Sequence, residues 1–215
     1  MASLSLLRKV LIGAITLLGA SIANATIIYT PGNFPQPNEE NILYNQPGLL
    51  SGPALTVTGT TQQSGFTISF NSNENLFTPA QGQSRVQAQD GGFALLNFTL
   101  PGATLQDVIF NLNSVNQAAG TATVTVTEFD GGGSNFALAL GNGSNFLTIF
   151  GINGDLISSV RISSSIDITD NRQVRVSGAA PRTPPNNVPE PSTLLLVSSL
   201  LMLTGVVTRR RKATK

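Results

Sequence analysis

The chain has 215 residues, contains no cysteine, no histidine and no tryptophan, and is only 11% charged. These absences exclude disulfides, cysteine and histidine nucleophiles, Ser-His-Asp triads and the usual zinc ligands. Lysine occurs only at Lys9, Lys212 and Lys215, so the middle of the chain also lacks Schiff-base and Ser-Lys chemistry.

Charge is unevenly distributed along the chain. Between Thr26 and Val188 there are five arginines and ten carboxylates, a net charge of −5, although the whole chain carries +1. A nucleic-acid-binding domain would show the opposite sign, so no nucleic-acid partner is expected.

The first 25 residues have the pattern of a secretory signal peptide. Arg8 and Lys9 form a basic start, residues 10–22 form an apolar stretch, and Ala23 and Ala25 fit the small-x-small cleavage rule. We therefore expect export and cleavage before Thr26. The alternative is an uncleaved N-terminal anchor, for which the apolar stretch is short.

Residues 26–178 are predicted to form a β-domain. They contain short β-branched and aromatic runs separated by glycine, asparagine and proline, with no helical period of apolar residues. Residues 31–53, rich in proline and asparagine, are predicted as a long loop. The expected strands are 26–30, 54–58, 66–70, 85–88, 93–100, 108–112, 121–129, 136–140, 145–152, 156–162, 165–169 and 173–177.

The pattern of these strands indicates an all-β fold, an antiparallel β-sandwich with jelly-roll-like character. Residues 121–127 alternate threonine with alanine or valine, which predicts one exposed and one buried face. Asn153-Gly154 lies between two apolar runs and predicts a hairpin. The expected core contains Phe66, Phe70, Phe93, Phe98, Phe110, Phe129, Phe136, Phe146 and Phe150.

The C-terminal part has three features in a fixed order. Residues 179–188 are a proline-rich linker, which cannot enter a sheet interior and is expected to be extended. Residues 193–208 are largely apolar and would form a helix of roughly 24 Å, slightly shorter than a hydrocarbon core of about 30 Å. Arg209, Arg210, Arg211 and Lys212 follow and would stay in the cytoplasm.

Pro189, Glu190 and Pro191, followed by this apolar segment and the basic cluster, resemble the PEP-CTERM sorting signal of Gram-negative bacteria. The resemblance covers residues 188–212 and makes residues 189–215 a sorting and anchor segment. It implies a partner, the membrane-embedded enzyme exosortase, and an inner-membrane stage before transfer to the cell surface or the extracellular space. It also implies an association with exopolysaccharide and biofilm systems. The alternative is a plain C-terminal anchor.

Three kinds of site remain for the β-domain. Carboxylate-based glycoside hydrolysis would need two acids, and Glu74 with Glu128 is one candidate pair. Calcium would need oxygen ligands such as Asp167, Asp170 and Asn171, although these residue types also simply form turns. Carbohydrate binding would need exposed aromatic rings, for which Tyr29 and Tyr44 are the candidates; the alternative is that both tyrosines pack the long loop onto the sandwich.

The sequence therefore favours an exported, non-enzymatic protein of the cell envelope or extracellular matrix. Its β-domain would act as a structural or adhesive module, with no cofactor expected unless calcium binds. Two alternatives stay open: a carbohydrate-binding module that contacts extracellular polysaccharide, and a carboxylate-based glycosidase.

Overall fold

Antiparallel β-strands make up most of the described structure, a computed structural model that covers residues 26–79 and 84–182. A 3-10 turn, η2, covers Val115–Gln117. The strands are β1 (Thr26–Pro31), β2 (Glu40–Leu43), β3 (Ala54–Thr61), β4 (Thr67–Phe77), β5 (Arg85–Ala88), β6 (Phe93–Thr99), β7 (Ala103–Thr104), β8 (Asp107–Ser114), β9 (Gly120–Glu128), β10 (Gly133–Leu140), β11 (Asn145–Ile152), β12 (Ile157–Ser177) and β13 (Ala180–Pro181).

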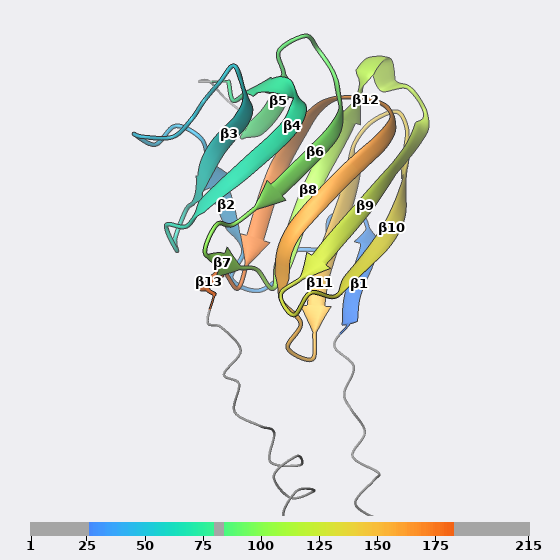
Figure 1. Cartoon of the computed structure of the whole chain (residues 1–215). Helices are drawn as coiled ribbons and strands as arrows, with labels where there is room; N and C mark the ends of the chain where they lie inside the picture. The colour runs from blue at the N-terminus through green and yellow to red at the C-terminus, as the bar shows by residue number, and fades with distance from the viewer. Residues whose placement is uncertain (1–25, 80–83, 183–215) are drawn as a thin grey trace, which may run out of the picture. The chain divides into compact units, whose positions relative to one another are not determined.

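The strands are arranged in two layers, as Figure 1 shows. The front layer has the order β3-β4-β6-β12-β9-β10, and the back layer runs from β12 through β8 and β11 to β1. Every pairing is antiparallel. The prediction of an all-β, sandwich-like antiparallel domain is thus confirmed.

Strand β12 belongs to both layers. Residues 157–164 pair with β9 and β6 in the front layer, and residues 168–177 pair with β8 in the back layer. Register shifts accompany the passage between layers, and a second shift lies between Arg172 and Arg175, where Gln173 has a positive φ of 54°. Bulges of this kind bend a strand, which allows one strand to cross from one layer to the other.

Apart from β12 itself, strand pairing joins the two layers on one side only. β2 pairs with both β12 and β3, and β5 pairs with both β12 and β4, so hydrogen bonds connect the layers there. On the other side, β10 and β1 are the outermost strands, and each pairs with a single neighbour. We refer to this side as the open side.

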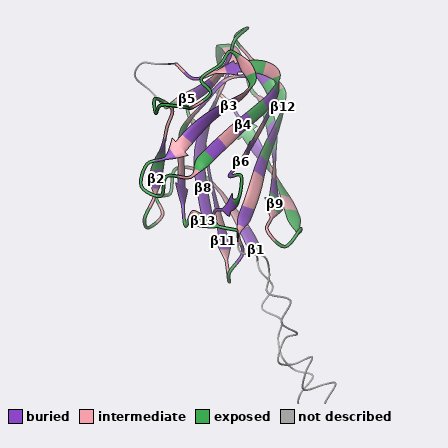
Figure 2. Ribbon diagram, turned by 60° about the vertical axis from the view of Figure 1, so that its left-hand side comes forward, coloured by how far each residue is buried: buried purple, intermediate pink, exposed green. Residues whose placement is uncertain are grey.

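The core fills the space between the layers. Figure 2 shows buried residues alternating with exposed ones along the strands. β9 follows the predicted alternation, with Ala122, Val124 and Val126 buried. Phe70, Phe93, Phe98 and Phe110 are fully buried, as predicted, whereas Phe66 and Phe136 pack at the margin.

The core prediction is wrong for three phenylalanines. Phe146 and Phe150 alternate with the buried residues Leu147 and Ile149 on β11, so they point to the other face and are only half-buried. Phe129 follows the end of β9 and is also half-buried. Alternation along the strand, rather than hydrophobicity alone, decides which rings reach the core.

Several predicted boundaries are also wrong. The expected long loop of residues 31–53 contains β2, and residues 156–177, predicted as three strands, form the single strand β12. β7 and the first part of the proline-rich linker, β13, pair with each other. Asn153 and Gly154 do form a tight turn, with positive φ values of 58° and 94°. However, β11 does not pair with β12, so the turn links the two layers and the hairpin prediction is wrong.

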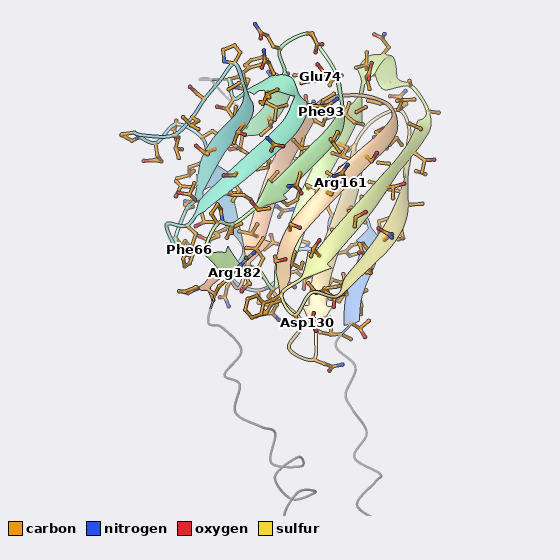
Figure 3. All side chains as sticks on the ribbon, in the orientation of Figure 1. Phe66, Glu74, Phe93, Asp130, Arg161 and Arg182 are labelled. Atoms are coloured by element: carbon orange, nitrogen blue, oxygen red, sulfur yellow. The ribbon has the colours of Figure 1, made fainter. Side chains whose placement is uncertain are left out.

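Both ends of the described domain lie at the same end of the sandwich. Thr26 begins β1 there, and β13 lies there as well (Figure 1). We call this the chain-end side, and the opposite end, where Figure 3 places Glu74 and Phe93, the far end. Within residues 26–79 and 84–182, no helix has the length and apolar character needed to cross a membrane. The predicted signal peptide and anchor helix lie outside these residues.

Candidate functional site

The residues predicted for processing and anchoring fall outside the described part of the chain. They are Ala23, Ala25, Pro189, Glu190, Pro191, Arg209, Arg210, Arg211 and Lys212. Their roles remain predictions from the sequence.

The three residues predicted for calcium are not brought together as a cation site. Asp170 is 1% exposed, and its two carboxylate oxygens each accept a hydrogen bond from Arg172, at 2.8 Å. Arg85 lies 3.8 Å from the same carboxylate, and the Asn113 side chain donates to it at 2.6 Å. Arginines thus occupy the positions that a cation would need, and Asp170 is a buried ion-pair centre.

The other two members of that set lie in different surroundings. Asp167 is exposed and lies beside Gly92, whereas Asn171 is fully buried and its side-chain oxygen and nitrogen have no hydrogen-bond partner. Among the described residues, no group of three or more acidic side chains is arranged to hold a metal ion.

Tyr29 packs across the open side rather than offering a free aromatic face. Its ring stacks on Phe136 of β10, and its hydroxyl lies 2.7 Å from the hydroxyl of Ser134. Burial raises the pKa of the Tyr29 phenol, and the hydrogen bond with Ser134 partly opposes this. Tyr29 therefore connects the two layers.

Tyr44 lines a pocket of about 560 Å³, which lies between the end of β2, the segment before β3 and the end of β4. One side of its ring contacts the core, where its centroid is 5.7 Å from that of Phe70. Its hydroxyl is buried and has no hydrogen-bond partner, and burial raises the pKa of this phenol. The ring forms the border between the core and the pocket.

The Tyr44 pocket combines apolar and uncharged polar groups. Phe77, Leu49 and two prolines supply apolar surface, and Asn45, Gln46, Ser51 and Thr78 supply amide and hydroxyl groups. No charged side chain among the described residues lines it. A few polar groups around an aromatic surface are typical of small-ligand and sugar sites, and the volume lies within the usual range of about 300–1,000 Å³.

The predicted acid pair Glu74 and Glu128 is not a pair in the structure. Figure 3 places Glu74 at the far end and Asp130, two residues after Glu128, at the chain-end side. Carboxyl groups that act together on a glycosidic bond lie about 5–9.5 Å apart, so these two cannot do so.

Glu128 instead belongs to an acidic cluster with Asp130 and Asp155. The carboxyl of Glu128 interacts with that of Asp155, which is 5% exposed and whose buried Oδ2 has no hydrogen-bond partner. Burial and the neighbouring carboxylates raise the pKa values of Glu128 and Asp155.

A second pocket, of about 380 Å³, was not found by sequence reasoning. It lies at the chain-end side, between the loop after β1 and the ends of β11 and β12, and its lining includes Phe150, Gln36 and Asp107. Asp107 is 7% exposed and accepts a hydrogen bond from Ser177, and burial raises its pKa. The acid lies at the start of a strand with no distinctive motif, so only the folded arrangement reveals it.

Comparisons with known proteins do not show a family for this chain. No protein-family profile matches the sequence, and no curated protein matches it. One solved structure, the enzymatically active domain of tailspike protein 4 from bacteriophage CBA120, is similar at a TM-score of 0.25 and 11% identity. The match covers 73% of this chain and 20% of the tailspike chain. At this TM-score, the likeness does not establish a shared fold.

Proposed function

We propose that the chain is exported, held by its C-terminal segment and sorted to the cell surface or matrix by an exosortase-type enzyme. There its β-domain acts as a non-enzymatic structural or adhesive module. The jelly-roll-like connectivity of this module remains a prediction. Two sorting patterns flank one domain in the sequence, and this arrangement supports the proposal.

The observation that carries the proposal furthest is the position of the domain's two ends. Thr26 and β13 lie at the same end of the sandwich, so the far end carries neither end of the domain. The Tyr44 pocket, lined by the end of β4, lies toward that far end. An adhesive module needs this geometry, with the attachment at one end and the contact surface at the other.

Mass spectrometry of the mature protein, isolated from Gram-negative cells that make exosortase, tests the sorting step. We expect peptides that end near residues 188–191 and no peptides from residues 209–215. Replacing Pro189, Glu190 and Pro191 together with alanine should leave the tail in place. The matched control, Pro184→Ala with Pro185→Ala in the linker, should be processed normally. A mature wild-type chain that still carries its basic tail would overturn the sorting proposal.

A second candidate function, binding of a neutral polysaccharide, is favoured by the Tyr44 pocket. The pocket presents an aromatic ring, amides and hydroxyls without any charge, which matches a ligand whose surface consists of hydroxyl groups and C–H faces. An acidic polysaccharide would find no cationic partner there.

Affinity electrophoresis of the full-length chain in gels that contain a neutral or an acidic polysaccharide tests this function. We expect retardation by the neutral glucan dextran and not by alginate. Gln46→Ala with Asn45→Ala should weaken the retardation at least fivefold, whereas Gln63→Ala, an exposed amide away from the pocket, should not. Equal retardation of both variants would remove the pocket as the binding site.

A further inference from the structure

Strand β10 has an unpaired edge on the open side of the sandwich. It pairs only with β9, in the register Ala137↔Thr123. The amide of Glu128 bonds to the carbonyl of Gly132, so the antiparallel alternation directs the backbone groups of Ser134, Phe136 and Leu138 toward β9. The backbone N–H and C=O groups of Asn135, Ala137 and Ala139 then point away from β9, toward the open side.

This edge lacks the protection that natural sheets usually carry. Exposed edges are commonly blocked by charged side chains, proline, a bulge or a covering segment. The sequence of β10, GSNFALAL, has no charge and no proline, and its pairing with β9 has no register shift over eight residues.

The other outer strands differ from β10. β1 ends in Pro31, and the edge of β3 away from β4 is covered by its pairing with β2 and by the amide of Thr58, which donates to the carbonyl of Leu50. Of the long strands at the margin of the described sheet, β10 is thus the one with an open, uncharged edge.

The inner face of β10 is fixed in position. Phe136 stacks on Tyr29 with ring centroids 5.3 Å apart, and Ser134 bonds to the Tyr29 hydroxyl. Leu138 and Leu140 are buried in the core. Because the side chains anchor the strand from inside, its outward backbone groups are held in a regular row that another strand can pair with.

We propose that β10 pairs antiparallel with β10 of a second copy of this chain, centred on Ala137. The two front layers then form one continuous sheet across a two-fold axis. In this register, Asn135 of each copy lies opposite Ala139 of the other. The core-facing side chains of both copies then lie on one face of the joined sheet, and their solvent-facing side chains lie on the other. The inference goes beyond the proposed function, since an adhesive module does not need to self-associate.

Charge favours the antiparallel over the parallel direction for the pairing of two copies, and the uncharged edge of β10 presents no like charges to itself in that direction. The nearest acids on this edge are Glu128, at the end of β9, and Asp130, in the turn before β10. Antiparallel pairing about Ala137 separates Asp130 from its counterpart by fourteen residue positions, about 48 Å at ~3.4 Å per residue. This is far beyond the screening length of about 8–10 Å, whereas parallel pairing would place the two acidic turns side by side.

Cysteine cross-linking of the full-length chain in mild detergent tests the pairing, because the natural sequence has no cysteine. Opposed residues of a hydrogen-bonded antiparallel pair have Cα atoms about 5.5 Å apart, which suits a disulfide. Ala137→Cys should therefore form a covalent dimer on mild oxidation. Thr123→Cys is the matched control, since Thr123 is the exposed neighbour of Ala137 on the inner strand β9 and cannot reach its own copy. We expect at least tenfold less dimer from it.

A second pair of variants measures the association without a cross-link. Ala137→Lys places like charges opposite each other across the proposed interface and should shift the sedimentation profile toward monomer. Thr123→Lys should leave it unchanged. The proposal is overturned if Ala137→Cys and Thr123→Cys cross-link equally, or if both lysine variants sediment like the wild-type chain. Neither result depends on export or sorting, so failure here is distinguishable from failure of the proposed function.

Discussion

Tyr29 and Phe136 stack with their ring planes only 9° apart, and this contact connects the outer strand of the back layer to the outer strand of the front layer. No backbone pairing joins β1 to β10. On the open side, side-chain packing therefore holds the two layers together. On the opposite side, backbone hydrogen bonds through β2 and β5 join them.

Removing this contact should destabilise the domain. Phe136→Ala is expected to lower the free energy of unfolding by about 2 kcal/mol, since a half-buried ring and an aromatic pair are lost. Tyr29→Phe, which removes only the hydrogen bond with Ser134, should cost about 1 kcal/mol. Urea unfolding followed by circular dichroism measures both. Phe34→Ala is the control, because Phe34 is 49% exposed; a loss as large as that of Phe136→Ala would contradict the role assigned to the stack.

Asp170 should be among the charged residues whose loss is most destabilising. Asp170→Asn leaves Arg172 and Arg85 without their shared carboxylate, and we expect a loss of about 2–3 kcal/mol. Asp90→Asn, in an exposed turn, should change stability by less than about 0.5 kcal/mol. Thermal unfolding of both variants is the measurement. Equal melting temperatures would show that the ion pair contributes nothing.

Calcium should not stabilise the domain through Asp170. Because guanidinium groups occupy both carboxylate oxygens, the melting temperature should be the same in millimolar calcium and in chelator. A rise with calcium that Asp170→Asn abolishes would reinstate the cation site expected from the sequence.

The acidic cluster gives a pH dependence of definite sign. Burial and neighbouring carboxylates raise the folded-state pKa of Glu128 above its ordinary value of 4.5. The folded state then holds its proton more tightly than the unfolded state, so this contribution to stability is present below about pH 4 and is lost as pH rises through the folded pKa. Glu128→Gln should therefore raise the melting temperature at pH 7 and leave it unchanged near pH 4.

Glu74→Gln is the matched control for this experiment, since Glu74 lies at the far end, away from the cluster (Figure 3). It should produce no such difference between the two pH values. A melting temperature of Glu128→Gln that falls at pH 7 would mean that Glu128 stabilises the fold as a carboxylate.

Gly59 should not tolerate a side chain. A Cβ atom there would lie 2.4 Å from the Ile42 side chain and 3.1 Å from the Tyr44 ring. Gly59→Ala is thus expected to cost about 1–3 kcal/mol and to disturb the Tyr44 pocket. At Gly141, an added Cβ atom would meet no other atom within 4 Å, and the backbone φ is not positive. Gly141→Ala should therefore be neutral or slightly stabilising. Chemical denaturation compares the stability of the two variants. Equal effects would mean that Ile42 and Tyr44 do not restrict the space at Gly59.

Local patterns predicted the strands but not their partners. β9 and β11 were predicted nearly to the residue because strong alternation and turn residues mark them. The Asn153-Gly154 turn was also predicted, yet the strands it joins pair with others, since turn chemistry fixes the local backbone and not which neighbours the flanking strands select. β12 was divided into three because serines and polar residues interrupt its apolar pattern where it crosses between layers.

The candidate sites also divide into residues that a local pattern predicted and contacts that depend on which strands pair. Tyr44 was predicted because sugar sites use exposed aromatic rings and the chain has no tryptophan and two tyrosines, and the structure places it at a pocket. Asp107 and the Glu128–Asp155 contact were not predicted, because residues 128 and 155 meet only through the pairing of β9 with β12. The contact of Asp170 with Arg85 likewise depends on a neighbouring strand, β5, whereas Arg172 lies only two residues further along β12.

The dual membership of β12 has a mechanical consequence. Tension applied to the chain beyond Ser177 first meets β13, which is held to β7 by a short pairing. The load then runs along residues 168–177 of β12, whose hydrogen bonds to β8 lie across the direction of pulling and shear together, before it reaches residues 157–164, which pair with β9 and β6. Because this one strand enters both layers, a pull at its end is distributed over the whole sandwich, and the domain can carry force between a tether at one end and a contact at the other.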